Sequence, residues 1–404
     1  TLTNKGKIDI KSKSSAGMLV ENKNGTLKKE NMKAINKGEI NLAVDKEKNV
    51  GMSANNAIAE NENKISISSK KSTGMFTQNN GTITNRGNIS STGEENIGMV
   101  AKDAGSGAIN EGEISLEGKS SLGMVASESG KVLNKKNITT KGEHSLGMYI
   151  RENSTGENTA DGVISLLEKE SVGMYIKNKS GNRDLGIALN SATKGIINLE
   201  KESTVGIYVD NALGENKSII NVRKGNSAGM YGSSDSKITN ALKINISNEK
   251  SAGMYALDSN ATNTATGTIT LTGSTGATSG SAGMYGKITS SSQKDYSILN
   301  EGIINLTNVI KNVGIYGESV SGAPKKLTLQ NNKEINIANG SPQSVGIFAS
   351  NDVNNNVDKI EAINSATGTI TVNSEESIGI SAVKSTVNNS GTITMNDKKS
   401  AGIY

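Results

Sequence analysis

Few residues of this chain have the chemistry of a catalytic site. The 404-residue sequence contains one histidine, His144, and no cysteine, which leaves no thiolate nucleophile and no cysteine-ligated zinc site. Adjacent carboxylates occur at Glu94-Glu95 and Glu375-Glu376. Neighbours on a strand point to opposite faces, whereas glycoside cleavage needs two carboxyl groups about 5–9 Å apart across one substrate. These pairs therefore do not predict a hydrolase.

Two other short motifs suggest chemistry at first sight. Glu143 precedes His144 and could form an acid–base dyad with it, but a solvated position on a strand is the simpler interpretation. Gly105-Ser106-Gly107 lacks the third glycine of a dinucleotide-binding loop, so we interpret it as a turn. Zinc-ligand spacings and the calcium-binding Gly-Gly-x-Gly-x-Asp nonapeptide are also missing. We therefore expect no catalytic residues, no cofactor and no required metal.

The composition excludes further classes of protein. Only 33% of the residues are hydrophobic and 3% aromatic, with no Trp and 46 Gly, so a core of large aromatic side chains is excluded. No segment approaches the ~18 consecutive apolar residues of a membrane helix. Residues 1–50 hold 11 Lys and 6 acidic residues, but aromatic residues do not interleave with this charge as they do in nucleic-acid platforms. We expect a segment that is not embedded in a membrane and does not bind nucleic acid.

Two short motifs alternate along the whole chain without a miss. The first is an Ile within runs such as Asn110-Glu111-Gly112-Glu113-Ile114, and the second is a Gly flanked by an apolar residue and by Met or Ile. Fifteen such glycines occur, at positions 17, 51, 74, 98, 123, 147, 173, 206, 229, 253, 283, 314, 346, 379 and 402. The distance from Ile to Gly is 9 residues in eleven copies, whereas the distance from Gly to the next Ile varies from 14 to 24. One arc of the repeat is therefore fixed and the other accepts insertions.

The alternation of residue types within each copy predicts β-strands. Around the Gly, the positions one before, one after and three after are mostly apolar, as in Leu122, Met124 and Ala126. Around the Ile, the next residue is small and polar and the one after it is usually apolar. A period of two indicates strands that bury one face. We accordingly expect the Gly and the residue two positions after it to face outward.

Two or three short strands in a minimal 23-residue period indicate an all-β fold, a right-handed parallel β-helix solenoid of about 15 coils. A leucine-rich repeat is the main competitor, but its Leu spacing is missing. We expect residues 1–404 to form a single repeat array, a rod on the order of 70 Å long. Because both ends fall inside a repeat unit, we also expect this array to be a section of a longer rod.

The most distinctive candidate binding feature is a column of aromatic residues two positions after the Gly. Seven consecutive copies carry Tyr there and the next carries Phe, giving Tyr149, Tyr175, Tyr208, Tyr231, Tyr255, Tyr285, Tyr316 and Phe348. Such a column could stack on sugars or anchor a protein partner. Alternatively, the rings stack on one another and stabilise the sheet. The sequence leaves both interpretations open.

Inserted arcs are the second candidate, because loops of solenoids often carry binding. Longer arcs are expected at 18–39, 174–196, 272–303, 315–334 and 347–369. The aromatic column and three of these arcs coincide between about 280 and 370, where Lys294, Lys325 and Lys326 add positive charge. This region would suit acidic glycans or carboxylate-rich proteins. The alternative is that the loops are neutral insertions and the lysines only solubilise them.

Serial Ser-x-Gly-Met-Tyr and Asn-x-Gly-x-Ile motifs, from Asn4-Lys5-Gly6-Lys7-Ile8 to Ser400-Ala401-Gly402-Ile403-Tyr404, resemble the passenger regions of large fusobacterial-type autotransporter adhesins, which are type V secreted. This resemblance implies a cell-surface protein anchored at the outer membrane through a C-terminal translocator barrel outside this chain. It also implies attachment to glycans or proteins of host cells or other bacteria, and a role in virulence. A structural spacer stalk is the main alternative function, and a polysaccharide-cleaving enzyme is a weaker one.

Overall fold

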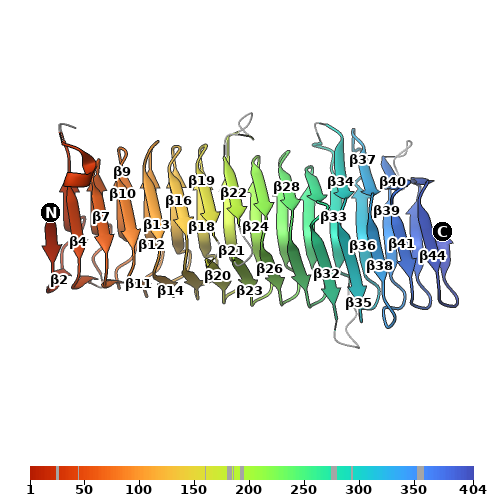
Figure 1. Cartoon of the computed structure of the whole chain (residues 1–404), viewed down its shortest axis with the longest axis horizontal. Coiled ribbons are helices and arrows are strands. Elements are labelled where there is room, and N and C mark those ends of the chain that lie inside the picture. Colours follow the sequence, from red (N-terminus) through yellow and green to blue (C-terminus); the bar gives the residue numbers. More distant parts are fainter. Residues whose placement is uncertain are drawn as a thin grey trace. The chain divides into compact units, whose positions relative to one another are not determined.

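The computed structural model describes residues 1–23, 27–43, 45–159, 161–179, 184, 186–191, 195–273, 280–292, 294–352 and 359–404. The chain divides into two compact units, Thr1–Lys201 and Glu202–Tyr404. In each unit the strands follow one another around a coil, and successive coils stack on one another (Figure 1).

Three parallel sheets enclose the core of the first unit. Sheet A consists of β1 (Leu2–Asn4), β4 (Lys33–Asn36), β7 (Ile58–Asn61), β10 (Thr82–Asn85), β13 (Gly107–Asn110), β16 (Lys131–Asn134), β19 (Thr155–Asn158) and β22 (Ile187–Asn190). Sheet B consists of β2 (Lys7–Ile10), β5 (Glu39–Leu42), β8 (Lys64–Ile67), β11 (Asn88–Ser91), β14 (Glu113–Leu116), β17 (Asn137–Thr140), β20 (Val163–Leu166) and β23 (Ile196–Leu199). Sheet C consists of β3 (Ala16–Glu21), β6 (Val50–Asn55), β9 (Thr73–Gln78), β12 (Ile97–Lys102), β15 (Leu122–Ser127), β18 (Leu146–Arg151) and β21 (Val172–Lys177). A short 3-10 helix, η1 (Lys29–Asn31), lies between β3 and β4.

The second unit has the same three-sheet architecture. Its sheet A consists of β25 (Leu213–Asn216), β28 (Lys237–Asn240), β31 (Asn260–Asn263), β34 (Tyr296–Asn300), β37 (Leu327–Asn331), β40 (Ile360–Asn364) and β43 (Thr386–Asn389). Its sheet B consists of β26 (Ile219–Val222), β29 (Lys243–Ile246), β32 (Thr268–Thr272), β35 (Ile303–Thr307), β38 (Glu334–Ile337), β41 (Thr369–Val372) and β44 (Thr392–Met395). Its sheet C consists of β24 (Val205–Asp210), β27 (Ala228–Ser233), β30 (Ala252–Leu257), β33 (Ala282–Ile288), β36 (Val313–Ser319), β39 (Val345–Ser350), β42 (Ile378–Val383) and β45 (Ala401–Ile403).

The register within each unit stacks equivalent residues of the repeat directly. In sheet B, Ile89 pairs with Ile114, which pairs in turn with Ile138. These isoleucines and the Met or Ile that follows each sheet C glycine fill the interior, and most are completely buried. Each unit is therefore a right-handed parallel β-helix, which confirms the predicted fold. The continuity of a single array over residues 1–404 stays a prediction.

The corner between sheets B and C has a fixed backbone geometry. In every copy except the one with the extended arc before Gly283, the residue three positions before the sheet C glycine adopts a left-handed conformation. Its φ lies between 51° and 61°. The members are Ser14, Lys48, Lys71, Glu95, Ser120, His144, Glu170, Ser203, Asn226, Lys250, Lys311, Gln343, Glu376 and Lys399. Because the turn needs this left-handed residue at a fixed position before the Gly, the number of residues between the Ile and the Gly rarely varies.

A ladder of asparagines, buried except at its end members Asn4 and Asn389, runs along the corner that joins sheets A and B. Each side-chain Nδ2 donates to the Oδ1 of the next asparagine in the same unit, over 2.8–2.9 Å. The ladder comprises Asn4, Asn36, Asn61, Asn85, Asn110, Asn134, Asn158 and Asn190 in the first unit, and Asn216, Asn240, Asn263, Asn300, Asn331, Asn364 and Asn389 in the second. In the sequence these residues are evident only as part of the motif that precedes Ile. These side chains can be buried because both the N–H group and the oxygen of each amide form hydrogen bonds.

Replacing one ladder asparagine should destabilise the coil stack. Asn134 donates to Asn158 and accepts from Asn110, so Asn134→Ala removes buried hydrogen bonds on both sides and should cost about 3 kcal/mol of unfolding free energy. Urea unfolding measures this loss. Asn137→Ala is the matched control. Asn137 lies on the same coil as Asn134, but its hydrogen bond, to Glu113 of the preceding coil, is on the surface. Equal costs for the two variants would show that the ladder is not a stabilising element.

The sheet C glycines should not tolerate a methyl group. A Cβ at Gly123 would lie 2.4 Å from the carbonyl oxygen of Gly147 and 2.7 Å from Ile138 Cγ2. Gly123→Ala should therefore lower the free energy of unfolding by about 1–3 kcal/mol through overpacking. Gly107→Ala is the control, since a Cβ there meets no atom within 4 Å. The interpretation fails if both substitutions are equally harmless in thermal or urea unfolding.

Candidate functional site

The predicted aromatic residues lie on the outer face of sheet C. Each ring is half-buried, and each stands between a buried Met or Ile and a buried residue one position further along its strand. In the first unit Tyr149 lies on β18 and Tyr175 on β21. In the second unit the column consists of Tyr208 on β24, Tyr231 on β27, Tyr255 on β30, Tyr285 on β33, Tyr316 on β36 and Phe348 on β39. The outward orientation expected for the column is therefore observed.

The rings of the second unit from Tyr255 to Phe348 stack on one another. Tyr255 and Tyr285 have ring centroids 4.5 Å apart with 9° between their planes. The stack continues from Tyr285 to Tyr316 at 4.9 Å and from Tyr316 to Phe348 at 5.3 Å. Tyr231 meets Tyr255 edge-on, at 89°. Because Tyr285 and Tyr316 are stacked on both sides, they offer ring edges and hydroxyl groups to a partner rather than open ring faces.

The position of the sheet C glycine differs from the sequence-based expectation. The Gly was expected on the outer face beside the tyrosines, and the apolar residue before it was expected inside. In the structure the Gly is buried, where its missing Cβ leaves room for the isoleucine of sheet B and the next coil's carbonyl group. The preceding residue is instead half-buried on the outside, as Leu146 is on β18 and Val172 on β21. The strand's alternation breaks at this point, since Gly and the following Met or Ile are both buried.

This reversal produces a hollow on sheet C of the second unit. Three successive coils carry alanine before the Gly, at Ala228, Ala252 and Ala282. These alanines form the floor of a depression of about 490 Å³. One side is lined by Tyr231, Tyr255, Tyr285 and Tyr316, and the other by the corner residues Asn226, Lys250 and Gly280. The three consecutive alanines were the sequence signal for this hollow, but their outward orientation was not evident from alternation.

A carboxylate fixes the hydroxyl groups at one end of the column. Tyr316 donates a hydrogen bond to Glu318 over 3.0 Å, and Lys287 forms an ion pair with the same carboxylate. Partial burial acts to raise the pKa of Glu318, but hydrogen bonds from Lys287, Tyr285 and Tyr316 outweigh it, so the pKa is lowered. Burial also raises the pKa of the Tyr285 and Tyr316 phenols, and Glu318 raises both further. At neutral pH this end of the column holds neutral phenols and an ionised Glu318.

The predicted lysines lie apart from the hollow, in loops that follow sheet C strands. Lys294 lies between β33 and β34, and its amine is 2.7 Å from a carboxylate oxygen of Asp235. Lys325 and Lys326 lie between β36 and β37, and the Lys326 backbone N–H donates to Asp295. These loops occupy the corner between sheets C and A, whereas the hollow is lined by the corner between B and C. The arc 315–334 is fully described, but residues 24–26, 180–183, 185, 192–194, 274–279, 293 and 353–358 of the other arcs lie outside the described residues.

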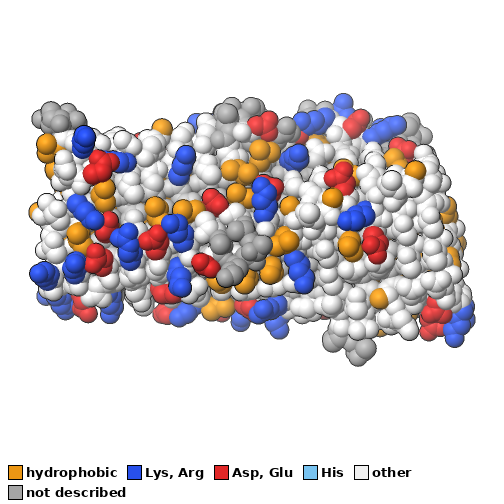
Figure 2. Space-filling view, viewed as in Figure 1, with side chains coloured by type: hydrophobic (Ala, Val, Ile, Leu, Met, Phe, Trp, Pro, Cys, Tyr) orange, Lys and Arg blue, Asp and Glu red, His pale blue; other side chains and the backbone are white. Residues whose placement is uncertain are grey.

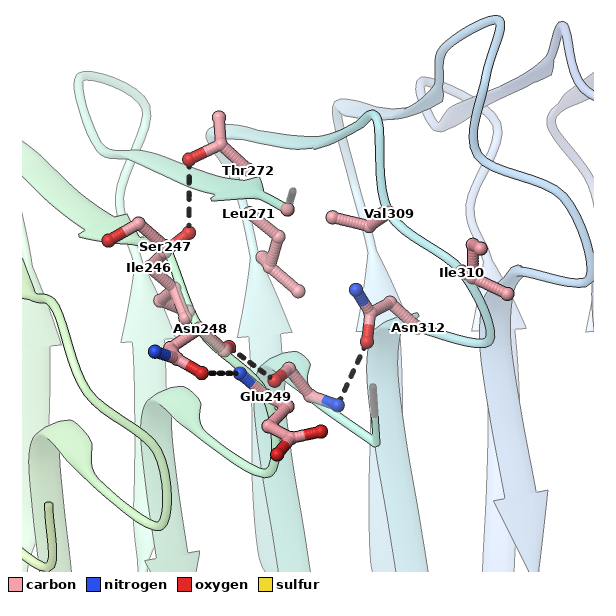
Figure 3. Close-up of a pocket in the computed structure, with 11 residues that line it drawn as sticks. Ile246, Ser247, Asn248, Glu249, Leu271, Thr272, Val309, Ile310 and Asn312 are labelled. Carbon is pink, nitrogen blue, oxygen red and sulfur yellow. Dashed lines mark hydrogen bonds between the residues drawn. The ribbon is translucent and has the colours of Figure 1, made fainter. Parts of the chain in front are cut away.

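A second, smaller cavity lies near the end of β32 (Figure 3). It has a volume of about 50 Å³, and Leu271 and Val309 are among its lining residues. The side chain of Ser281 donates to the Asn248 carbonyl group, and the Ser281 N–H donates to Asn312 Oδ1. Drug-sized ligand pockets usually have about 300–1,000 Å³. This cavity suits water and does not define a ligand site.

His144, Glu143 and Glu94, considered above as catalytic candidates, contact side chains of neighbouring coils. His144 Nδ1 lies 3.0 Å from Glu170, while Glu143 pairs with Lys119 at 2.9 Å. Glu94 pairs with Lys70. Among the described residues, no three His, Cys, Asp or Glu side chains converge as metal ligands would.

Many acidic and basic side chains of the first unit form ion pairs across neighbouring coils. Glu60 pairs with Lys33 at 2.8 Å and with Arg86 at 3.0 Å, and Glu111 pairs with Arg86 and Lys135. Figure 2 likewise shows basic and acidic side chains lying close together on the visible face. A nucleic-acid platform would instead present a continuous basic surface. The interleaved pairs therefore favour a different kind of partner.

The geometry defines the class of this protein as a parallel β-helix, and comparisons with known proteins refine it. The family model of the BigA third pectate lyase-like domain matches residues 1–230. The chain therefore belongs to the BigA pectate lyase-like domain family. The structure described as "The cryo-EM structure of the Vag8-C1 inhibitor complex" is similar in fold, with a TM-score of 0.49, 8% identity and 100% of each chain covered. A search of the curated proteins finds no match. No helix in the described part of the chain has the length and apolar character needed to cross a membrane.

The half-buried phenols should make the second unit sensitive to alkaline pH. Burial raises the pKa of Tyr231, Tyr255, Tyr285 and Tyr316 above 10. An unfolded tyrosine loses its proton near pH 10 while the folded one keeps it, so stability should fall as pH rises above about 10. Urea unfolding between pH 8 and 11.5 measures this slope. The slope should be shallower for Tyr231→Phe, and an unchanged slope would contradict the assignment.

Proposed function

We propose that this chain is a non-catalytic binding section of a surface-displayed passenger protein, and that it acts in adhesion. Membership of the BigA pectate lyase-like domain family supports a role on a β-helix scaffold. The observation that carries the proposal is the outward column of tyrosines in sheet C and the alanine-floored hollow beside it. Tyrosines and small residues around a depression provide apolar area with polar tips, which suits recognition.

The finer features of the proposal follow from the repeat motifs. Their resemblance to autotransporter passengers supports a fusobacterial-type adhesin anchored at the outer membrane. The proposed partners are proteins or glycans on host cells or other bacteria. Of these two classes, the stacked rings favour proteins, because Tyr285 and Tyr316 have no open face on which a sugar could stack.

The proposal that the chain is not an enzyme rests on the pairing of its carboxylates. Glu94 and Glu143 each bind a lysine of a neighbouring coil. A general acid needs a raised pKa, but hydrogen bonds from Lys70 and Lys119 lower the pKa values of these two carboxyl groups. A pectate lyase-like fold by itself does not supply catalysis, because function depends on the site rather than on the fold.

A structural spacer is the second candidate function. The asparagine ladder and the ring stack both stabilise the coils without any ligand. A spacer would need these features and nothing more. The alanine-floored hollow is the feature that the spacer interpretation leaves unexplained.

Binding and cleavage assays on the purified chain separate these functions. Labelled protein should bind host or bacterial cells, or an immobilised protein or glycan array, saturably and in competition with unlabelled chain. Incubation with a panel of acidic polysaccharides should release no reducing ends. Absence of saturable binding on every surface would favour the spacer, and release of reducing ends would favour an enzyme.

A further inference from the structure

We propose that the hollow on sheet C of the second unit docks an extended acidic peptide segment of a protein partner. Aliphatic side chains of that segment lie against the alanine floor and the tyrosine edges, and one of its carboxylates meets Lys250. This inference rests on the proposed binding function and names the partner's chemistry.

The floor is apolar because three coils carry alanine at a position where the coils on either side carry a larger apolar residue. Ala228, Ala252 and Ala282 are only 5–7% exposed, although they occupy the outward position that precedes the Gly. Val205 and Val313 hold the same position in the coils on either side of these three. The three alanines thus leave a gap bounded at both ends by larger residues. Such a gap suits aliphatic side chains, which gain free energy by leaving water.

The wall presents ring edges instead of ring faces. Tyr255, Tyr285 and Tyr316 stack nearly parallel, with 9–12° between neighbouring planes. A sugar ring needs an open aromatic face, and the stack uses those faces internally. Aliphatic side chains can pack against edges and floor together, which favours a peptide over a glycan.

The rim supplies positive charge without a described counter-ion. Lys250 lies at the B–C corner beside the hollow, is exposed, and has a backbone φ of 51°. Lys224 is exposed on the corresponding turn of the preceding coil. Among the described residues, neither amine forms an ion pair with a carboxylate. On the turns 223–227 and 247–251, Glu249 is the one acidic residue against Arg223, Lys224 and Lys250, while the turn before Val205 carries Glu200, Lys201 and Glu202. The rim beside Lys250 therefore has an excess of positive charge, which complements an acidic segment.

The dimensions fit a short extended chain. Coils are spaced by about 4.8 Å, so the alanines at 228 and 282 lie roughly 10 Å apart, a length that about three extended residues span. In an extended segment alternate side chains point to the same side, about 6.6 Å apart. Two aliphatic side chains can therefore reach the floor while the intervening acidic residue stays at the rim.

A fluorescent peptide tests the proposal directly. The probe is the acetylated and amidated peptide Glu-Leu-Glu-Trp-Glu-Leu-Glu, whose indole is the only one in the mixture because the chain has no Trp. We expect its fluorescence to change saturably with the full chain. Ala252→Leu should weaken binding at least tenfold by filling the hollow. Leucine occupies the equivalent position in Leu146, beside Tyr149, so the coil geometry accommodates it.

Matched variants separate docking from folding. Val172→Leu enlarges the same repeat position in the first unit, outside the hollow, and should leave binding unchanged. Lys250→Ser should weaken binding several-fold and reduce its salt dependence, and Ser120 shows that serine fits this left-handed position. Circular dichroism and urea unfolding verify each fold. If Ala252→Leu does not fold, Ala228→Val replaces it, since Val205 precedes it in the neighbouring coil.

Three results would overturn the proposal. They are failure of the peptide to bind, equal binding by the Ala252→Leu variant, and preferential binding of a hyaluronan oligosaccharide that this variant loses. The corresponding Lys-Leu-Lys-Trp-Lys-Leu-Lys peptide should not bind, and equal binding of it would also refute the charge argument. If these tests fail while the chain still binds cells, the proposed function stands and its site lies elsewhere. If the chain binds the peptide but does not bind cells, the proposed adhesion role is refuted instead.

Discussion

The β-helix depends above all on the hydrogen bond between one buried asparagine side chain and the next. A primary amide can donate to the following coil and accept from the preceding one, so the same residue type repeats without leaving a polar atom unpaired. Asn85, for example, donates to Asn110 and accepts from Asn61. An aspartate at this position would have no proton to donate and would bury a charge. This constraint fixes the chain path where sheet A turns into sheet B, and the isoleucine that follows takes its buried position from it.

Small and slender side chains fill the interior of this regular stack of coils. Sheet A contributes residues such as Ala59, Ala108 and Ala188, all buried, opposite the larger residues of sheets B and C. The sheet C glycines bring the coils so close that a methyl group would touch the backbone of the next coil. A large aromatic core is therefore not merely absent from the composition but incompatible with the spacing. The tyrosines can stack only outside, where rings one coil apart meet at 4.5–5.4 Å.

Alternation in the sequence was enough to predict strands of sheets B and C, their parallel stacking and the outward column of Tyr255 and its neighbours. It left the third strand uncertain, because sheet A positions such as Gly156 and Gly214 do not give a strong apolar signal. It also assigned the Gly and the residue before it to the wrong faces of the strand, because the rule of alternation does not foresee two consecutive buried residues such as Gly253 and Met254. The hollow depends on that reversal. The hollow is therefore evident only in the folded chain, even though its alanines are plain in the sequence.

The asparagine ladder also has a direction. In both units every Nδ2 points toward the coil that follows in the sequence and every Oδ1 toward the coil that precedes it. The side-chain amide dipoles therefore add along the stacking axis instead of cancelling, as peptide dipoles do in an α-helix. Because these amides are neutral, their alignment does not depend on ionisable residues and persists across the pH range. The backbone N–H groups that follow the asparagines, such as that of Lys135, donate in the opposite direction, to the preceding coil, so the two rows of dipoles oppose each other.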